Sequence, residues 1–236
     1  MKRNAAGRVE TVVNTDENGR PMPNLRGVTQ VHLRWNDRGQ PVHSRFADAG
    51  DHPAMFNGIA GAEVAYDEAG NVTAIRRLDA DGNPKDAPDG DLNDFGAWAV
   101  KEFTRNDSGE ITAVSIRTAD TGAAQASVKR INIGYDANGF PSDLVLFTPG
   151  GKQSSRLLYQ RDERGNVIEH KELDADGDIT EWNRRELDEW GNATLTEELD
   201  VDGQVEERTL STFKDDRLVS ETYEYANHQP REVGSG

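Results

Sequence analysis

The residues of this chain best suited to chemistry are carboxylates spaced two residues apart in its C-terminal third. In the segment Glu172-Leu-Asp-Ala-Asp-Gly-Asp-Ile179, acidic side chains alternate with other residues around a glycine. Alternating oxygen ligands, a glycine at the sixth position and an apolar residue at the eighth are typical of a calcium-binding loop. Asp174, Asp176 and Asp178 are therefore the candidate calcium ligands, and no other cofactor is indicated.

Two features of this segment argue against calcium. The twelfth position, where a calcium loop needs a bidentate Glu, is occupied by Asn183. The related segments around Asp79 and Asp200 lack that ligand too. The alternative is that Asp-x-Asp-Gly is a tight turn, in which the first carboxylate accepts hydrogen bonds from the backbone. We favour the turn.

The sequence contains no recognisable catalytic motif. Gly-x-Ser-x-Gly, His-Glu-x-x-His and phosphate-binding glycine loops are all absent. A glycosidase acid needs a desolvated pocket, and only 34% of the residues are hydrophobic. His32 and His43 flank the turn at Gly39, but a three-residue loop would place them on opposite faces of a sheet, where they cannot share a metal ion. We therefore expect that the protein is not an enzyme.

Four aromatic side chains are candidate contacts to a partner. Trp182 lies in the middle of an expected strand, and Trp190 lies inside a turn. Because a tryptophan in a turn is hard to bury within its own hairpin, it either stacks on a neighbouring unit or contacts a sugar or a protein. Phe95 and Trp98 end the longest expected loop, and we expect them to anchor a partner there.

The elements that must position these side chains are tight turns. Thirteen of the 23 glycines have Asp or Asn three residues earlier, several times the number that chance would give. Asp or Asn at the first position of a type I turn accepts a hydrogen bond from the backbone two residues on, and Gly at the fourth position adopts the left-handed conformation. The pattern therefore predicts β-hairpins with three-residue loops, repeated along the chain.

The spacing of the turns sets the strand length. After Gly151 the turn glycines recur in alternating steps of 14 and 12 residues, at Gly165, Gly177, Gly191 and Gly203. A step of 12 residues leaves a strand of about eight. Upstream, every second step is longer, and the additional residues fall in segments 21–27, 53–61 and 84–96, each of which follows or contains a proline. Since alternate turns of a meander emerge on the same edge, we expect these three loops to cluster in space.

These patterns predict an all-β fold, an antiparallel meander of repeated hairpins with Asp-x-x-Gly turns that forms an extended sheet rather than a compact sandwich. Glu-rich segments such as 167–173 also favour helix, but they are too short to stand as one. Few segments have a clean apolar face, so both faces of the sheet are expected to be partly wet. We place the array at 15–225, between an N-terminal extension at 1–14 and a tail at 226–236 that ends like an added linker.

The composition excludes several kinds of partner. With 27 Lys and Arg against 43 Asp and Glu, the net charge is −16, which repels phosphate backbones and anionic lipid. We therefore expect no nucleic acid, and no apolar run is long enough for membrane insertion. No signal peptide is visible in this chain. There is no cysteine, so disulfides and thiolate metal sites are excluded.

The residues around the turns resemble the YD repeats of bacterial Rhs-type proteins. The matching segments are Tyr66-Asp-Glu-Ala-Gly-Asn-Val72, Tyr135-Asp-Ala-Asn-Gly139, Arg161-Asp-Glu-Arg-Gly-Asn-Val167 and Leu187-Asp-Glu-Trp-Gly-Asn-Ala193. The resemblance covers about residues 15–225 and implies β-hairpin strips that coil into sheets or shells, usually on surface or secreted proteins of bacteria. Only Tyr66 and Tyr135 supply the tyrosine of the family, and about six units are fewer than a shell needs. The resemblance therefore implies a short divergent array or a fragment.

The leading functional hypothesis is a non-catalytic repeat scaffold or binding module of a bacterial surface or secreted protein, with a protein or carbohydrate partner. One alternative is a calcium-dependent module of a larger adhesin or toxin. Another is an acidic carbohydrate-active enzyme. Exposed hydrogen-bonding edges at the ends of the sheet would also allow end-to-end self-association. The resemblance implies an extracellular or cell-envelope location.

Overall fold

A computed structural model describes residues 1–88, 97–119 and 130–225 of the chain, and all regular structure in these residues is β. The main sheet has 16 strands, hydrogen-bonded to one another in the order of the sequence, and it is open. This confirms the predicted all-β antiparallel meander. By its internal contacts the chain divides into an N-terminal unit, Met1–Ile131 with Thr148–Gly151, and a C-terminal unit, Asn132–Phe147 with Lys152–Gly236.

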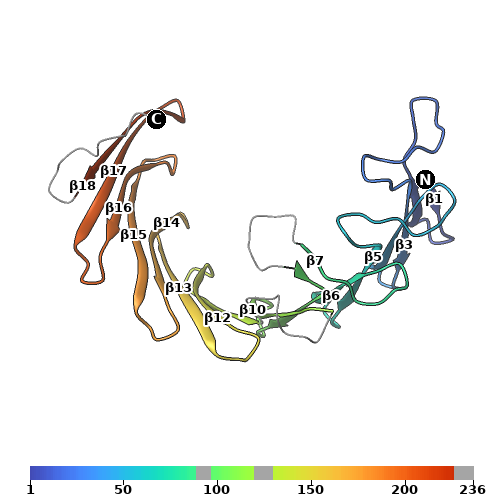
Figure 1. Cartoon of the computed structure of the whole chain (residues 1–236), viewed down its shortest axis with the longest axis horizontal. Coiled ribbons are helices and arrows are strands. Elements are labelled where there is room, and N and C mark those ends of the chain that lie inside the picture. The colour runs from blue at the N-terminus through green and yellow to red at the C-terminus, as the bar shows by residue number, and fades with distance from the viewer. Residues whose placement is uncertain (89–96, 120–129, 226–236) are drawn as a thin grey trace. The chain divides into compact units, whose positions relative to one another are not determined.

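The N-terminal unit holds most of the shorter strands (Figure 1). In sequence order, the strands of the main sheet in this unit are β1 Lys2–Arg3, β2 Val9–Val13, β3 Gln30–Trp35, β4 Pro41–Ala47, β5 Gly61–Tyr66, β6 Val72–Leu78, β9 Val100–Arg105 and β10 Ile111–Arg117. A separate two-stranded sheet pairs β7, Ala87–Pro88, with β8, Ala97–Trp98.

The C-terminal unit is a regular meander of longer strands. After β11, Arg130–Tyr135, which spans the boundary between the units, come β12 Pro141–Phe147, β13 Gln153–Arg161, β14 Val167–Leu173, β15 Ile179–Leu187, β16 Ala193–Leu199, β17 Val205–Lys214 and β18 Arg217–Tyr225. Each strand from β12 to β17 pairs antiparallel with the next.

The turns have the chemistry that the sequence predicts. In the turn after β5, the Asp67 Oδ1 atom accepts a hydrogen bond of 2.8 Å from the Asn71 N–H, and the Gly70 N–H donates to the Asp67 carbonyl oxygen at 3.1 Å. Gly70 has φ 91° because the chain must turn left-handed there. The other described glycines of this pattern also have positive φ, and they include Gly82, Gly165, Gly177, Gly191 and Gly203.

The register next to the turns differs from the expectation. Trp35 lies opposite Pro41, but Arg34 lies opposite His43, so Val42 is an additional, bulged residue. His32 therefore lies opposite Arg45, and His32 and His43 share one face of the sheet. The expectation that they lie on opposite faces is wrong, because a three-residue loop does not fix the register when a bulge follows it.

Two further details of the expected organisation need correction. Residues 1–14 are no extension, because the Asn4-Ala-Ala-Gly7 turn joins β1 to β2, with the Gly7 N–H donating to the Asn4 carbonyl oxygen at 2.9 Å. The turn spacing also predicts a left-handed glycine at Gly50, after β4, but the left-handed residue there is Asp51, with φ 65°. The tail at 226–236 lies outside the described residues.

The core of the N-terminal unit lies mainly at the strand ends. Most residues within the strands are half-buried, as expected for a single sheet with two wet faces. The fully buried residues of this unit gather where the long connections meet the sheet, and they include Val28, Thr29, Ala47, Ala60, Leu78 and Ala99. The structure is therefore most tightly packed at the edge from which the long connections emerge.

Candidate functional site

Three long connections emerge from one edge of the N-terminal unit. They join β2 to β3, β4 to β5 and β6 to β9, and the register places the strand ends Val13, Gln30 and Ala47 side by side. Gly61 and Leu78 lie opposite each other in the same way. We call this edge the loop edge and define it as residues 14–29, 48–60 and 79–99. Residues 89–96 of the third connection lie outside the described residues.

Each connection begins with a tight turn and a short return toward the strand that it has just left. The return consists of a single bridge in each case, at Thr15–Pro21, Ala47–Pro53 and Leu78–Pro84. Proline has no N–H and cannot extend a ladder of hydrogen bonds. The proline at each bridge therefore ends the pairing and lets the chain leave the sheet.

The chain re-enters the sheet at a backbone junction. The Phe46 carbonyl oxygen accepts a hydrogen bond of 3.0 Å from the outgoing Ala54 N–H, and the Phe46 N–H donates to the carbonyl oxygen of the returning Ala60 at 2.8 Å. Asn14 and Arg77 make the same two contacts to the first and third connections. Ala60 is 2% exposed, because a small side chain is needed where three backbone segments meet. Each loop thus has a base that backbone hydrogen bonds join to the sheet.

The connections contact one another, so the predicted clustering is confirmed for the described residues. The Arg26 guanidinium of the first connection lies 4.8 Å from the centre of the Phe56 ring in the second. Phe56 also packs against Phe46 of β4, with ring centres 5.3 Å apart. A Cβ atom added to Gly58 would lie 3.6 Å from the Cβ atom of Ala87 in the third connection.

Exposed apolar side chains mark this edge. Met22, Leu25 and Met55 are 50%, 107% and 43% exposed, and they belong to the first two connections. Apart from Met1, they are the exposed large hydrophobic side chains of the described part of the N-terminal unit. Apolar side chains gathered on adjoining loops are typical of a surface that contacts another protein.

Trp98, one of the two expected aromatic anchors of this edge, is not exposed for such a contact. Trp98 is 5% exposed. The Arg77 Cζ atom lies 3.5 Å from the centre of the Trp98 ring, and the Lys101 Nζ atom lies 4.3 Å from it. These two cations cover part of the Trp98 indole and attract it. Trp98 therefore lacks the exposed surface that an anchor for a partner needs. Phe95 lies outside the described residues.

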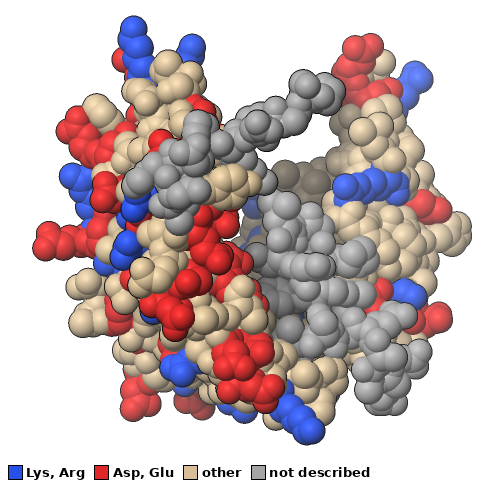
Figure 2. Space-filling model, turned by 60° about the vertical axis from the view of Figure 1, so that its left-hand side comes forward, with Lys and Arg blue, Asp and Glu red and all other residues tan. Residues whose placement is uncertain are grey.

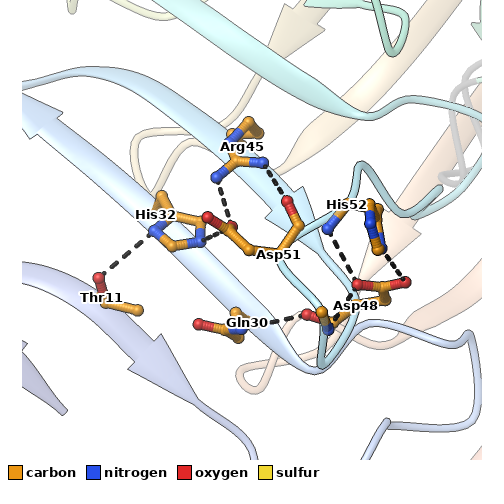
Figure 3. A network of polar contacts seen from close by, with 8 residues as sticks. Thr11, Gln30, His32, Arg45, Asp48, Asp51 and His52 are labelled. Carbon is orange, nitrogen blue, oxygen red and sulfur yellow. Dashed lines mark hydrogen bonds and ion pairs between the residues drawn. The ribbon is translucent and has the colours of Figure 1, made fainter.

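A polar network ties the second connection to the sheet (Figure 3). The Asp51 carboxylate lies 2.6 Å from the Arg45 guanidinium and 2.9 Å from the His32 Nε2 atom. The hydrogen bond from Arg45 is the main cause that holds the pKa of Asp51 below its usual value. Asp48 pairs with His52 at 3.2 Å, and its carbonyl oxygen accepts a bond from the Gln30 side chain at 3.1 Å.

This network contains a hydroxyl, an imidazole and a carboxylate in sequence, because the Thr11 Oγ1 atom lies 3.4 Å from His32 Nδ1. A catalytic triad needs a buried carboxylate that orients the imidazole through an aligned hydrogen bond. Asp51 is 58% exposed, and its contact with His32 is close but not aligned as a hydrogen bond. The arrangement is that of an anchor for the turn. The absence of catalysis remains a prediction.

The carboxylate of Asp174, the first of the calcium ligands expected in the C-terminal unit, is used by its own turn. The Asp174 Oδ1 atom accepts hydrogen bonds from the backbone N–H groups of Asp176 and Asp178, at 2.9 and 3.0 Å. Within the described ranges, no group of three or more His, Asp or Glu side chains is placed to hold a metal ion. Asp174, Asp176 and Asp178 thus form a turn among the described residues, and calcium binding by them stays a prediction.

The two tryptophans of the C-terminal unit have different surroundings. The Trp182 Nε1 atom donates to Glu169 Oε1 at 3.0 Å, and the Lys171 Nζ atom lies 3.6 Å from the centre of its ring. Trp182 also covers the next turn, because a Cβ atom on Gly203 would lie 3.0 Å from the indole. Trp190, in contrast, is 69% exposed at its turn. Trp182 therefore packs on its neighbours, and Trp190 presents its ring to the surface.

Most of the negative charge lies in the C-terminal unit. Residues 132–147 and 152–225 contain 23 Asp and Glu against 10 Lys and Arg. Figure 2 shows acidic side chains crowded on the left of the view, where this unit comes forward. On one face the charges alternate directly across four strands, in the order Glu169, Arg184, Glu197 and Arg208. Sequence reasoning missed this row, because it depends on the register of every strand pair.

Glu197 is the buried centre of this row. Its side chain is 7% exposed and accepts hydrogen bonds from Arg184 at 2.6 Å and from Arg208 at 2.8 Å. Burial alone would raise the pKa of Glu197, but the hydrogen bonds from the two arginines outweigh burial and lower it. On the other face, Glu172 lies opposite Glu181 and Glu198 opposite Glu207. Like charges placed directly opposite each other destabilise a sheet.

No protein-family model matches the chain, and no curated protein matches it. Among solved structures it is similar to TcdB2-TccC3 without the hypervariable C-terminal region, at 14% identity and a TM-score of 0.33 over 90% of this chain and 13% of the other. A porin-like protein from Bacteroides uniformis matches at 10% identity and a TM-score of 0.32, over 69% of this chain and 87% of the other.

A third similar structure is the Tc holotoxin pore of Photorhabdus luminescens, with 12% identity and a TM-score of 0.28 over 93% of this chain and 15% of the other. The chain thus spans less than a sixth of the length of the toxin chains that it matches. At these scores the likeness carries no functional inference. A search of the described residues for a membrane-spanning helix gives no candidate.

Proposed function

We propose that the chain is a non-catalytic repeat scaffold that binds a protein partner through its loop edge, as part of a bacterial surface or secreted protein. The observation that carries the proposal is the exposure of Met22, Leu25 and Met55 on two connections that contact each other. The bacterial and extracellular setting rests on the resemblance to YD repeats.

The opposite edge of the N-terminal unit is occupied by contacts between its own turns. The Arg8 guanidinium donates to the carbonyl oxygens of Asn36 and Asp37 in the next turn, at 2.5 and 3.0 Å. Gln40 donates to the Gly70 carbonyl oxygen at 2.9 Å, one turn further on. Polar groups that are already satisfied add little to binding. This supports the loop edge as the docking surface.

The chemistry of the loop edge favours a protein partner over a carbohydrate. Sugars usually bind to flat aromatic rings, but Trp98 is buried and Phe56 is half-buried against Phe46. Methionine is flexible and polarizable, so Met22 and Met55 can adapt to an irregular apolar surface on a protein. Full burial of one such side chain contributes roughly 1.5–3 kcal/mol, so three of them can dominate an interface.

The proposal is tested by photo-crosslinking followed by titration. A photoreactive residue at position 25 should give a defined crosslinked product with one protein, and the same residue at position 218 should not. With that purified partner, the triple variant Met22→Gln, Leu25→Gln, Met55→Gln should bind at least about tenfold more weakly. The control is the double variant Leu218→Gln, Val219→Gln, which removes two exposed apolar side chains of β18.

Two outcomes would overturn the proposal. One is a partner that crosslinks only from position 218. The other is a partner that binds the triple variant and the unchanged protein with equal affinity. Circular dichroism of the triple variant shows whether a loss of binding reflects loss of fold, because substitutions of exposed residues should leave the spectrum unchanged.

A further inference from the structure

The chain has three Asn-Gly pairs, and they lie in two kinds of turn. Asn18-Gly19 and Asn138-Gly139 belong to Asp-x-x-Gly turns, whereas Asn57-Gly58 lies in the second connection of the loop edge. An Asn followed by Gly is the pair most open to intramolecular attack, because glycine has no side chain to hinder the approach of its backbone nitrogen to the Asn Cγ atom. The three pairs differ in the hydrogen bonds that hold their turns.

The Asp-x-x-Gly turns hold both reacting groups in place. The Gly19 N–H donates to the Asp16 carbonyl oxygen at 3.0 Å, and the Asn18 N–H donates to the Asp16 carboxylate at 2.9 Å. With the two bonds that close the turn at Arg20, four hydrogen bonds fix this segment. Asn138-Gly139 is held in the same way by Asp136.

The turn at Asn57 is held far less firmly. Phe56 and Ile59 close it with two backbone hydrogen bonds, of 2.8 and 3.2 Å, and among residues 1–88, 97–119 and 130–225 no side-chain hydrogen bond adds to them. Asn57 and Gly58 have φ 51° and 82°, which makes this a two-residue hairpin of type I′. Both residues are exposed, and within the described residues neither the Gly58 N–H nor the Asn57 amide makes a hydrogen bond.

We propose that Asn57 is a site of self-modification, at which the chain converts its own side-chain amide to a carboxylate. When the two bonds of the hairpin open, the Gly58 backbone nitrogen loses its proton and attacks the Asn57 Cγ atom. A bond forms between that nitrogen and Cγ, the bond between Cγ and Nδ2 breaks, and Nδ2 leaves with the proton as ammonia. Water then opens the five-membered imide at one of its two carbonyl groups, which gives Asp or isoaspartate at position 57.

The product would change the loop edge. Either form adds a negative charge one residue from Phe56, whose ring lies 4.8 Å from the Arg26 guanidinium. The isoaspartate form also adds a methylene group to the backbone, which a two-residue hairpin cannot accept without rearrangement. The effect on partner binding rests on the proposed function. The modification itself does not, so the two can fail separately.

The test compares the three pairs within one sample of the full chain. The protein is aged at mildly alkaline pH, digested, and analysed by mass spectrometry that separates Asp from isoaspartate. Asn57 should convert about tenfold faster than Asn18 or Asn138, because fewer hydrogen bonds must open before attack. Conversion should also rise with pH, because the attacking nitrogen must lose its proton.

The denatured chain provides the control. In strong denaturant all three pairs should convert at similar rates, because each has the same Asn-Gly sequence and no turn remains. The Asn57→Gln variant should lose only the signal at position 57. Equal conversion of the three pairs in the folded protein would overturn the proposal. So would a preference for Asn57 that persists in denaturant, because the cause would then be the neighbouring sequence and not the turn.

Discussion

The Arg38 guanidinium donates a hydrogen bond to the backbone oxygen of Glu68, which lies in the next turn on the same edge. Arg38 is the third residue of its turn, and Glu68 is the second residue of the following one. In the C-terminal unit, Arg164 and Glu189 occupy the same two positions and make the same contact. At these two turns, one of which begins with Asn36 and the other with Asp162, the arginine at the third position joins consecutive hairpins, in addition to the ladder between the strands.

This contact predicts a measurable loss of stability. Arg164→Ala should lower the free energy of unfolding by about 0.5–1 kcal/mol, since the bond to a carbonyl oxygen is charge-assisted but solvent-exposed. Arg185→Ala, which removes an exposed arginine in the middle of β15, is the matched control and should have little effect. Urea titration measures both values. Equal losses would show that the contact between turns contributes nothing of its own.

The left-handed glycines should resist substitution to different degrees. Gly165 and Gly191 have φ 88° and 91°, so alanine at either position should cost roughly 1 kcal/mol of strain. A Cβ atom on Gly165 would also lie 2.6 Å from the Phe140 ring, whereas the nearest atom to one on Gly191 is 3.6 Å away. Gly165→Ala should therefore be the more destabilising. Gly150→Ala, without positive φ or a close neighbour, should be near neutral, and the prediction fails if it matches the other two.

Acid should weaken the turns. Hydrogen bonds from the Asn166 side chain and from backbone N–H groups lower the pKa of Asp162, and a backbone hydrogen bond from Asn71 is the main cause of the lowered pKa of Asp67. A carboxyl group with a lowered folded-state pKa stabilises the fold above its unfolded value of about 4, and this contribution is lost as pH falls through the folded pKa. Stability should therefore be retained at neutral pH and fall in acid. Between neutral pH and about pH 3, the Asp162→Asn variant should lose less free energy of unfolding than the unchanged protein. An equal loss in the two proteins would show that the Asp162 carboxylate does not cause the acid sensitivity.

Replacing the adjacent residues Glu197 and Glu198 should change the stability of the protein in opposite directions. Glu197 is buried and paired with Arg184 and Arg208, so Glu197→Gln should cost about 1–3 kcal/mol, because a neutral amide replaces the carboxylate that accepts hydrogen bonds from both arginines. Glu198 is exposed and lies opposite Glu207, so Glu198→Gln should be neutral or stabilising by about 0.2–0.5 kcal/mol. Urea unfolding of both variants tests the pair. If the two variants lost a similar free energy of unfolding, the pairing of charges around Glu197 and the repulsion at Glu198 would not set the stabilities of the two faces of the sheet.

The features that sequence predicts well here are those with local causes. An Asp or Asn followed three residues later by Gly specifies its own turn, because the carboxylate or amide and the left-handed residue lie within one segment. The positions of the hairpins and the shared edge of the loops follow from that spacing. The register does not follow, because a bulge such as the one at Val42 shifts every later pair by one residue.

The candidate site was predictable only in outline. The burial of Trp98 depends on Arg77 and Lys101, which belong to other strands of the sheet. The row around Glu197 needs correct register across four strands. Such contacts between distant segments have no local signal. The turn at Asp174, in contrast, has a local signal, because the Asp174 carboxylate accepts two backbone hydrogen bonds from its own segment.

Substitutions at the loop edge should affect stability or binding according to their place, because each connection has a packed base and an exposed tip. Ala99 is fully buried at the base of the third connection, so Ala99→Leu should overpack it and cost about 1–3 kcal/mol. Met55 is 43% exposed, so Met55→Gln should change the free energy of unfolding by less than about 0.5 kcal/mol and yet weaken partner binding. Urea unfolding and partner titration of the two variants measure both effects. If Met55→Gln destabilised the protein as much as Ala99→Leu, the tip would belong to the core, and the exposed apolar side chains would not form a docking surface.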